Sequence, residues 1–346
     1  MPYLEKMGLP YLSHNEICGL NKHLLNKKTD MTIAVIDCGT NTFNLLIKNT
    51  YTGEVFYNDK IAVRIGQGGL EENLINPDAW QRGIEALQAH RQTILNLVGY
   101  TASVYVMATS AVRSASNGAA FVAAAYAEVG LTINVITGQQ EADLIYLGVK
   151  QGIALTESAT LIMDIGGGST ELILLKGEII HFKESYQVGS SRLLEKFRPA
   201  DPILPEELEA INAHLEETFS DLLEACKVHQ PRILIGSSGS FDTIAQMCAA
   251  NFKTTNFDAA STNYTFKMHE YMQIAQKMIA ATYEERLNTP GMIAMRADLI
   301  VMAHLQINLL IKRLGIKTLQ QCNYALKEGL FLSLNSIYSP WQKSLL

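Results

Sequence analysis

Two polar, glycine-containing turns stand directly after apolar segments of this sequence. They are Asp37-Cys38-Gly39-Thr40-Asn41-Thr42 and Asp164-Ile165-Gly166-Gly167-Gly168-Ser169-Thr170. Glycine admits positive φ and lets the backbone approach a ligand closely, so that consecutive N–H groups can converge on an anion. The turns are candidate phosphate cradles, although a tight hairpin turn without a ligand has the same composition. Neither is a P-loop, because G-x-x-x-x-G-K-[ST] is absent.

Carboxylates flank both turns. Asp37 and Asp164 end the preceding apolar segments, and Glu171 begins the one that follows the second turn. Carboxylate oxygens, directly or through water, are the ligands that a hard cation such as Mg²⁺ prefers. An Asp at a strand end also often hydrogen-bonds its own backbone, so each residue alone is open to either interpretation.

Glu141 lies in the first turn of an expected helix. Thr137 and Gln140 have the spacing of a capping box, and the helix dipole favours an acid at this position without any catalytic role. The helix also joins the two turn-containing halves of the sequence. Glu141 can therefore reach a cleft between them, and both interpretations stay open.

Two further segments follow expected strands. Arg113 comes shortly after Val104–Met107, at the strand end where α/β sheets usually bind ligands, and its planar fork suits phosphate oxygens. A surface ion pair is the alternative for this residue. Ser238 and Gly239 lie between an expected strand and a helix that begins near Phe241, which is an anion-binding arrangement, or equally a simple N-cap by Ser240.

The elements that must position these residues form an α/β pattern. The first turn joins two strands within Ile33–Ile47, and the second joins two strands within Thr160–Leu175, which suggests a duplicated module. Apolar periodicity predicts further helices and strands between and after them. The helices are Pro77–Val98, Ala119–Val129, Gln139–Gln151, one from Pro205 to about Val228, and further helices to the end; the strands are Val104–Met107, Thr132–Ile136 and Arg232–Ile235.

Composition limits the possible classes of protein. The 346 residues are 48% hydrophobic and carry a net charge of −6, so a two-domain globular protein is expected and general nucleic-acid binding is not. The five cysteines form no C-x-x-C pair, and no stretch suggests a signal peptide or a membrane span. We expect a cytoplasmic protein with reduced thiols.

Taken together, these motifs resemble the exopolyphosphatase and guanosine pentaphosphate phosphohydrolase family, in its short two-domain form. The resemblance runs from about residue 33 to 330. Its matching segments are Asp37–Phe43, Ala108–Arg113, Gly138–Asp143, Asp164–Glu171, Gly236–Gly239, Pro290–Met292 with Arg296–Asp298, and Leu326–Gly329.

This resemblance implies a duplicated, two-lobed, actin-like (sugar kinase, heat-shock ATPase and ribonuclease H-like) fold. It implies lobe I at residues 31–137 and lobe II at 138–330. Residues 1–30 form an extension without a counterpart in the family, which we expect to be loosely ordered, and residues 331–346 form a tail that we expect to pack back on lobe I. The two glycine turns would face each other across the interdomain cleft. Glu141 would be the base that orients the attacking water, and Arg113 would bind the phosphate that is removed. Asp164, Glu171 and Asp37 would hold Mg²⁺, or alternatively Mn²⁺, while the segments of Asp298 and Glu328 look structural or cleft-lining.

The expected activity is removal of the terminal phosphate of inorganic polyphosphate, and by extension of guanosine pentaphosphate. A non-catalytic sensor of polyphosphate or guanosine tetraphosphate and an ATP-dependent small-molecule kinase are the rival hypotheses. A homodimer is a further expectation. Asp143 stands where some relatives carry a basic residue, which predicts weaker polyanion binding, short or intermediate substrates and low processivity.

Overall fold

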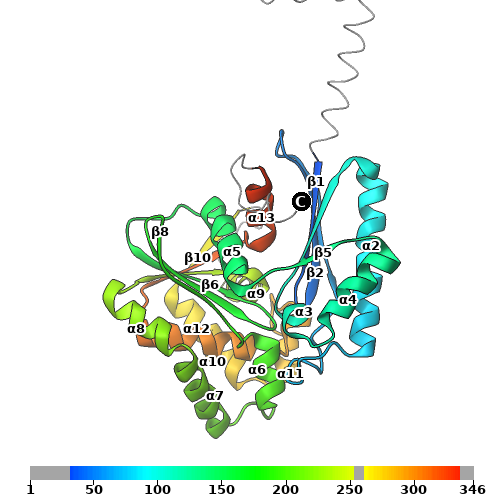
Figure 1. The fold of residues 1–346 in the computed structure, drawn as a ribbon. Helices are drawn as coiled ribbons and strands as arrows, with labels where there is room; N and C mark the ends of the chain where they lie inside the picture. Colours follow the sequence, from blue (N-terminus) through cyan, green and yellow to red (C-terminus); the bar gives the residue numbers. More distant parts are fainter. Residues whose placement is uncertain (1–31, 253–260, 336–346) are drawn as a thin grey trace, which may run out of the picture.

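The strands of the chain form two separate sheets (Figure 1). The computed structural model describes residues 32–252 and 261–335. One sheet has five strands in the order β3-β2-β1-β4-β5, and the other has six in the order β10-β11-β9-β6-β7-β8. We call each sheet with its helices lobe I and lobe II, in chain order. The extension expected at residues 1–30 and the part of the tail at 336–346 lie outside the described residues.

Lobe I opens with the expected hairpin. β1 pairs antiparallel with β2 and parallel with β4, so the carboxyl ends of β1 and β4 meet at one edge of the sheet. The strands are β1 (Thr32–Cys38), β2 (Thr42–Asn49), β3 (Val55–Ala62), β4 (Ser103–Ala108) and β5 (Ile133–Val135). The helices are α2 (Pro77–Val98), η2 (Gly99–Thr101), α3 (Ser110–Ser114), α4 (Gly118–Ala124) and the π-helix η3 (Ala125–Val129).

Lobe II repeats this opening. β6 pairs antiparallel with β7 and parallel with β9, so Asp164 sits opposite Glu171 as Asp37 sits opposite Asn44 in lobe I. The strands are β6 (Ala159–Ile165), β7 (Thr170–Lys176), β8 (Ile179–Tyr186), β9 (Ile233–Ser237), β10 (Asn263–Phe266) and β11 (Thr318–Cys322). The helices are α5 (Gly138–Gly152), α6 (Ser190–Phe197), α7 (Pro205–Thr218), α8 (Ser220–His229), α9 (Ser238–Phe252), α10 (Met268–Ala280), α11 (Tyr283–Leu287), η4 (Ala294–Arg296), α12 (Ile300–Leu314) and α13 (Leu326–Asn335).

Two sequence-based predictions were wrong in lobe II. The single helix expected from Pro205 to about Val228 is two helices, α7 and α8, because the chain turns at Phe219 and buries that ring edge-on against Tyr186, 5.1 Å away. The region after β9 is not wholly helical, since it contributes β10 and β11. Two of the five residues in β11 are Gln, so its sequence lacks the apolar pattern from which an internal strand is predicted.

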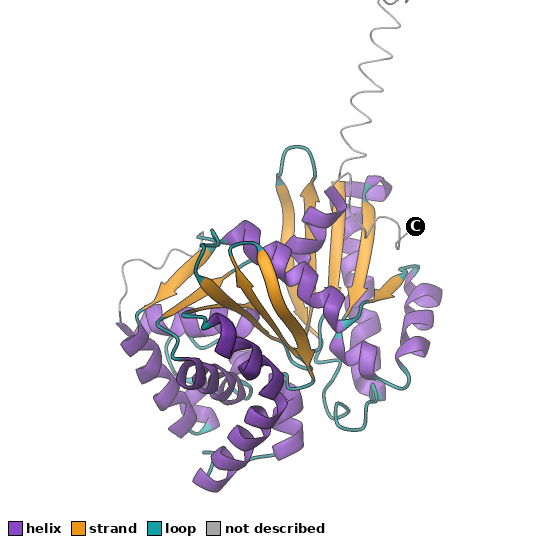
Figure 2. Ribbon diagram, turned by 60° about the vertical axis from the view of Figure 1, so that its left-hand side comes forward, coloured by secondary structure: helices purple, strands orange, loops and turns teal. Residues whose placement is uncertain are grey.

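Helices cover both faces of the sheet in lobe II (Figure 2). Alternate residues of β6 enter different apolar clusters: Leu161 and Met163 pack beneath α7, α9, α10 and α12, whereas Ile162 packs with α5 and α13. This second cluster also contains Val35 and Leu46 of lobe I, so α5 and α13 form an apolar joint between the lobes.

The start of the tail belongs to α13 and contacts lobe I. Lys48 of β2 lies 4.7 Å from the centre of the Phe331 ring. In the described part of the chain, Cys38, Cys226, Cys248 and Cys322 are buried free thiols. The helices described there are too short or too polar to cross a membrane.

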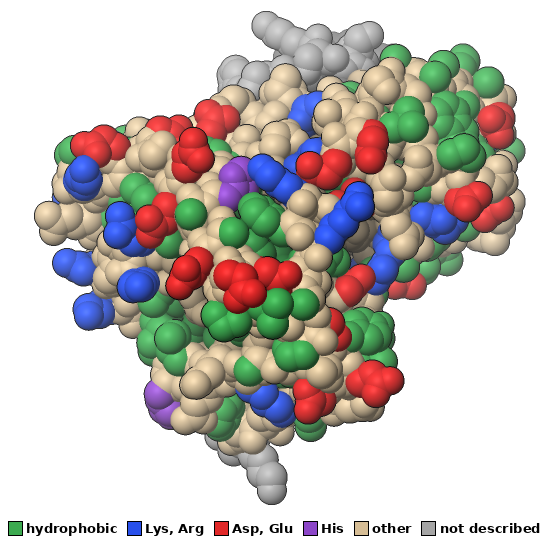
Figure 3. Space-filling model, turned by 90° about the horizontal axis from the view of Figure 1, so that it is seen from below, with side chains coloured by type: hydrophobic (Ala, Val, Ile, Leu, Met, Phe, Trp, Pro, Cys, Tyr) green, Lys and Arg blue, Asp and Glu red, His purple; other side chains and the backbone are tan. Residues whose placement is uncertain are grey.

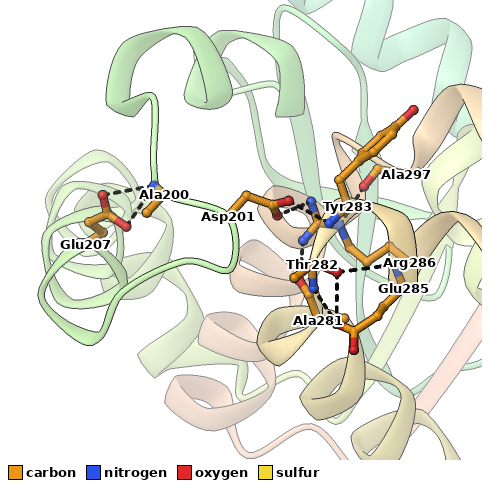
Figure 4. Close-up of polar contacts among 9 residues, drawn as sticks. All are labelled: Ala200, Asp201, Glu207, Ala281, Thr282, Tyr283, Glu285, Arg286 and Ala297. Carbon is orange, nitrogen blue, oxygen red and sulfur yellow. Dashed lines mark hydrogen bonds and ion pairs between the residues drawn. The ribbon is translucent and has the colours of Figure 1, made fainter.

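A buried arginine ties the long loop after α6 to the rest of lobe II (Figure 4). Arg286 donates to the carbonyls of Ala297 (2.8 Å) and Ala281 (2.6 Å) and to the carboxylate of Asp201 (2.8 Å). Its side chain is only 7% exposed, so these three acceptors depend on one guanidinium. These contacts of Arg286 form a buried node that stabilises lobe II and lies apart from the glycine turns.

Candidate active site

A polar cavity of about 170 Å³ lies between the lobes, where the two glycine turns meet. Most of the predicted site residues line its wall: Asp37, Gly39, Thr40, Asn41, Thr42, Glu141, Asp164, Gly166, Gly167, Gly168, Ser169, Ser238 and Gly239. Arg113, Thr170 and Glu171 are one layer behind that wall. The Thr170 hydroxyl points away from the cavity and donates to Gln306 at 2.8 Å.

The two turns have the same backbone geometry. In the first, the N–H of Gly39 donates to the carbonyl of Thr42, and in the second the N–H of Gly166 donates to the carbonyl of Ser169, each at 3.0 Å. Asp37 and Asp164 occupy equivalent positions one residue before the end of β1 and β6. The duplication inferred from the sequence therefore extends to the hydrogen bonding of the turns.

Glycine is required in the second turn by close approach, and the expectation of positive φ was wrong. Gly39, Gly166, Gly167 and Gly168 all lie outside the left-handed region. A Cβ on Gly167 would lie 2.6 Å from Nδ2 of Asn41, and a Cβ on Gly168 would lie 2.7 Å from Oγ of Ser110. The turns thus face each other so closely that a side chain cannot fit between them.

Several buried polar atoms around the turns lack a hydrogen-bond partner among the described residues. They are Nδ2 of Asn41, Oγ of Ser110, Nη2 of Arg113 and Oγ of Ser190. A buried donor without a partner costs about 1–3 kcal/mol, so a group of them at one place indicates a ligand that accepts hydrogen bonds. Phosphate oxygens are such acceptors.

Glu141 lies in the first turn of a helix that begins with a capping box, and it also lines the cavity between the lobes. Thr137 accepts from the N–H of Gln140 at 3.2 Å, and the Gln140 side chain accepts from the N–H of Thr137 at 2.8 Å. Glu141 is only 7% exposed, and its Oε2 accepts from Nη1 of Arg113 at 2.8 Å. Arg113 also donates to the carbonyl of Ile136 at 3.0 Å, which fixes the guanidinium behind Glu141.

Serine hydroxyls orient the other two predicted catalytic acids. Oδ2 of Asp164 accepts from Ser237 and Ser238, both at 2.7 Å. Oε1 of Glu171 accepts from Ser169 at 2.7 Å and from Ser185 at 2.6 Å. Ser238 has φ of 69°, a conformation that non-glycine residues rarely adopt, so its hydroxyl is held toward Asp164 at the cost of backbone strain.

Burial raises the pKa of the four predicted acids of this site. The pKa of Asp37 and that of Glu171 rise to about 7, chiefly by burial, with repulsion from Asp164 added in both cases. Burial, with repulsion from Glu171, raises the pKa of Glu141 well above its usual range, although Arg113 opposes the shift. The pKa of Asp164 is also raised by burial, against its serine hydrogen bonds. Such crowding of acids favours a nearby cation.

The donor set fits a hard divalent cation held partly through water. Oδ1 of Asp164 and Oδ1 of Asp37 face no hydrogen-bond donor from the described chain, and both residues line the cavity. No group of three or more His, Cys, Asp or Glu side chains within residues 32–252 and 261–335 is gathered closely enough to bind a metal by itself. Mg²⁺ commonly uses one or two carboxylates and completes its shell with water and phosphate oxygens, so the site remains suitable.

The cavity wall carries basic residues that were not among the predicted site residues, although Arg296 and Lys327 lie in matching segments of the sequence. Lys60 comes from β3, Arg296 from η4 and Lys327 from α13. Arg296 is 8% exposed, and its guanidinium makes no hydrogen bond or ion pair with another described residue, although it lies next to Gly239. Glu328 also lines the cavity, whereas Asp298 forms an ion pair with Arg64 at 3.0 Å.

Asp143 does not leave an unbalanced negative charge near Glu141. Its carboxylate forms an ion pair with Lys183 of β8, a residue about forty positions further along the chain. The negative charge on which the prediction of weaker polyanion binding was based is therefore partly neutralised. The sequence did not indicate this pair, because only the folded sheet brings Lys183 beside α5.

The two lobes begin with the same hairpin and enclose an acidic cavity lined by hydrogen-bond donors. This arrangement is that of a two-lobed, actin-like fold. The chain belongs to the Ppx/GppA phosphatase family, whose sequence pattern matches residues 48–336. Exopolyphosphatase 2 of Mycobacterium tuberculosis is 27% identical over 319 residues, covering 87% of this chain and 98% of that protein.

Solved structures agree with this assignment. An exopolyphosphatase from Cytophaga hutchinsonii is 32% identical, covers 88% of this chain and 97% of its own, and superposes with a TM-score of 0.84. The Aquifex aeolicus member of the Ppx/GppA family, 23% identical over 88% of this chain and 97% of its own, shares the fold with a TM-score of 0.71.

Proposed function

We propose that this protein is a Mg²⁺-dependent exopolyphosphatase that removes the terminal phosphate of inorganic polyphosphate. The supporting observation is that Asn41 and Ser110, whose side chains each carry a buried polar atom without a partner, line the same cavity as the glycine turns and the carboxylate of Glu141. Membership of the Ppx/GppA phosphatase family and the likeness to two exopolyphosphatases support the same activity.

Transfer of a phosphoryl group to water requires mainly positioning and charge stabilisation. The N–H groups of Gly167 and Gly168 donate to no other part of the described chain, so they can bind the phosphate together with Asn41 and Ser110. Glu141 lines the cavity, is held in place by Nη1 of Arg113, and accepts the proton of the attacking water. Arg113 fixes the carboxylate of Glu141. Its Nη2, which has no hydrogen-bond partner among the described residues, is assigned to the phosphate that is removed.

A cation held by Asp164 and Asp37, with Glu171 behind them, would supply charge neutralisation to the phosphate oxygens when bound. Lys60, Arg296 and Lys327 bind the part of the substrate that remains. Arg296 suits this role because its nearly buried guanidinium has no hydrogen-bond partner among the described residues. The nearby carboxylates of Asp242, Asp164 and Asp298 offset only part of its desolvation, so an anionic substrate would stabilise it further.

Short or intermediate chains and low processivity fit this site. Processive action needs an extended basic track, yet the cavity is small, and acidic and basic side chains alternate over the face seen in Figure 3. Gel analysis of partly digested long polyphosphate tests this: a smooth ladder of shortened products is expected. Untouched long chains beside free phosphate would show processive action.

Guanosine pentaphosphate is a second candidate substrate because the cavity adjoins another compartment. This compartment of about 460 Å³ shares Lys60, Asp242 and Asn323 with the first cavity, and its wall includes Tyr264 and Gln321. Amide and aromatic side chains of this kind can hold a nucleoside while its phosphates enter the glycine turns.

A phosphate-release assay with Mg²⁺ compares long polyphosphate, short polyphosphate, guanosine pentaphosphate and ATP. Release from short polyphosphate without a hydroxyl acceptor is the expected result. A requirement for an acceptor would indicate a kinase, and binding of guanosine tetraphosphate or polyphosphate without any phosphate release would indicate a sensor.

A further inference from the structure

Helix α6 of lobe II supports the second glycine turn from behind. The N–H of Ser190 donates to the carbonyl of Gly166, and the N–H groups of Ser191 and Arg192 donate to that of Gly167, at 2.9–3.0 Å. Because these carbonyls point to α6, the turn's own N–H groups are directed away from the helix, as a trans peptide requires. The turn and α6 therefore move as one unit.

The side chain of Arg192 joins this unit to lobe I. It is 8% exposed, and Nε donates to the carbonyl of Gly168 at 3.0 Å. Its Nη1 donates to the carbonyl of Leu70 at 2.6 Å, and Nη2 donates to Oγ of Ser114 at 3.2 Å. Ser114 directly follows Arg113, so one guanidinium contacts the glycine turn, a loop of lobe I and the segment that carries the catalytic arginine.

Glu195, one turn further along α6, binds the same loop of lobe I. Its two carboxylate oxygens accept from the N–H of Gly68 at 2.6 Å and from the N–H of Leu70 at 3.0 Å. Charge-assisted hydrogen bonds of this kind are roughly twice as strong as neutral ones. Arg192 and Glu195 thus hold both the carbonyl and the N–H of Leu70.

This side of the interface between the lobes is polar and hollow. It encloses a cavity of about 460 Å³ lined mostly by polar residues, including Asn41, Arg64, Gly68, Ser191, Glu195 and Asp298. The opposite side, at α5 and α13, is a packed apolar joint. Packed apolar contacts resist separation, whereas a few polar contacts around a hollow can exchange with water, so the lobes would pivot about α5 and α13.

We propose that Arg192 and Glu195 are positioning residues that close lobe I on lobe II and thereby set the second glycine turn and Arg113 in register for hydrolysis. This inference rests on the proposed function, because it assigns the two residues to that reaction. Neither residue touches the cavity that holds the phosphate; both act through Gly168, Leu70 and Ser114.

The test compares Arg192→Lys with Arg313→Lys, an exposed arginine of α12, and Glu195→Gln with Glu206→Gln, an exposed acid of α7. For each variant of the full chain, kcat per folded enzyme is measured with short polyphosphate, and hydrogen exchange is followed in the segments 66–70 and 166–169. A displacement of about 1 Å can cost on the order of 100-fold in rate, so we expect a loss of at least about tenfold in Arg192→Lys, and faster exchange in both segments. The two controls should match the parent protein.

A purely structural role predicts a lower melting temperature with unchanged kcat per folded enzyme, or faster exchange in 66–70 alone, and either result would overturn the proposal. The double variant should lose little more activity than Arg192→Lys, because both residues hold one loop. If Arg192→Lys does not fold, Glu195→Gln decides on the same criteria. If the parent protein releases no phosphate from any substrate, the proposed hydrolysis is wrong, while exchange with and without inorganic phosphate still shows whether the two segments are coupled.

Discussion

Replacing Glu141 by Gln removes the proposed base and keeps its shape. Because the Gln oxygen can still accept from Nη1 of Arg113, now 2.8 Å from Glu141, the local geometry should persist. A general base contributes about 10²- to 10⁴-fold, equal to about 3–5 kcal/mol of activation free energy. We expect kcat to fall by at least about 100-fold while KM changes little, since the lost group acts in the reaction step.

The thermal stability of Glu141→Gln should be equal to or above that of the parent protein. Glu141 is buried, and repulsion from Glu171 raises its pKa, so removal of the charge relieves an unfavourable interaction. The assay is phosphate release under Mg²⁺ at saturating short polyphosphate, combined with thermal unfolding. Glu128→Gln, an exposed change in lobe I, is the matched control. Near-normal turnover in Glu141→Gln would remove Glu141 from the mechanism.

Three other changes test separate parts of the structure. Arg113→Lys should lower kcat at least about tenfold, because Lys lacks the planar fork that binds Glu141 and Ile136 through one nitrogen and presents a second nitrogen beside it; full activity would limit Arg113 to a dispensable contact. Arg286→Met should lower the free energy of unfolding by about 3–5 kcal/mol, since it leaves buried carbonyls unpaired, whereas an unchanged denaturant midpoint would contradict the role of this node. Burial lowers the pKa of His304 to about 3, so its neutral form stabilises the fold above pH 6.5 and that contribution is lost as pH falls toward 3. Between pH 7 and 5 the free energy of unfolding should fall by about 2 kcal/mol because of this histidine. That fall should disappear in His304→Met but persist in His269→Gln. Equal pH profiles of stability for the two variants would refute the prediction.

Local features of the chain could be predicted from the sequence. Each glycine turn lies between two strands that pair with each other, so its position depends on neighbouring residues only. The capping box of Thr137 and Gln140 likewise set the start of α5 and hence the depth of Glu141. Hairpins and helix caps depend on contacts within a few residues, which is why pattern and spacing are informative there.

The tertiary structure decided which distant residues meet. Lys60 comes from a segment with no distinctive motif, and Arg296 from a matching segment to which the sequence assigned no role; only the joining of the lobes brings them to one cavity. The reason for glycine in the second turn, close approach to Asn41 and Ser110, also involves the other lobe. So does the contact of Arg192 with Leu70, more than a hundred residues earlier in the chain.

The burial of the acidic side chains also depends on the assembled fold. The sequence identified Asp37, Asp164 and Glu171 as acids near turns, but a carboxylate in a turn is ordinarily solvated and keeps its usual pKa. Their raised pKa values follow chiefly from desolvation in the assembled protein, and repulsion from Asp164 adds to the shift at Asp37 and Glu171. The chain by itself thus determined which chemical groups lie beside the turns, whereas the packing of the two lobes decided their protonation and their partners, because desolvation and charge coupling depend on everything that surrounds a group in space.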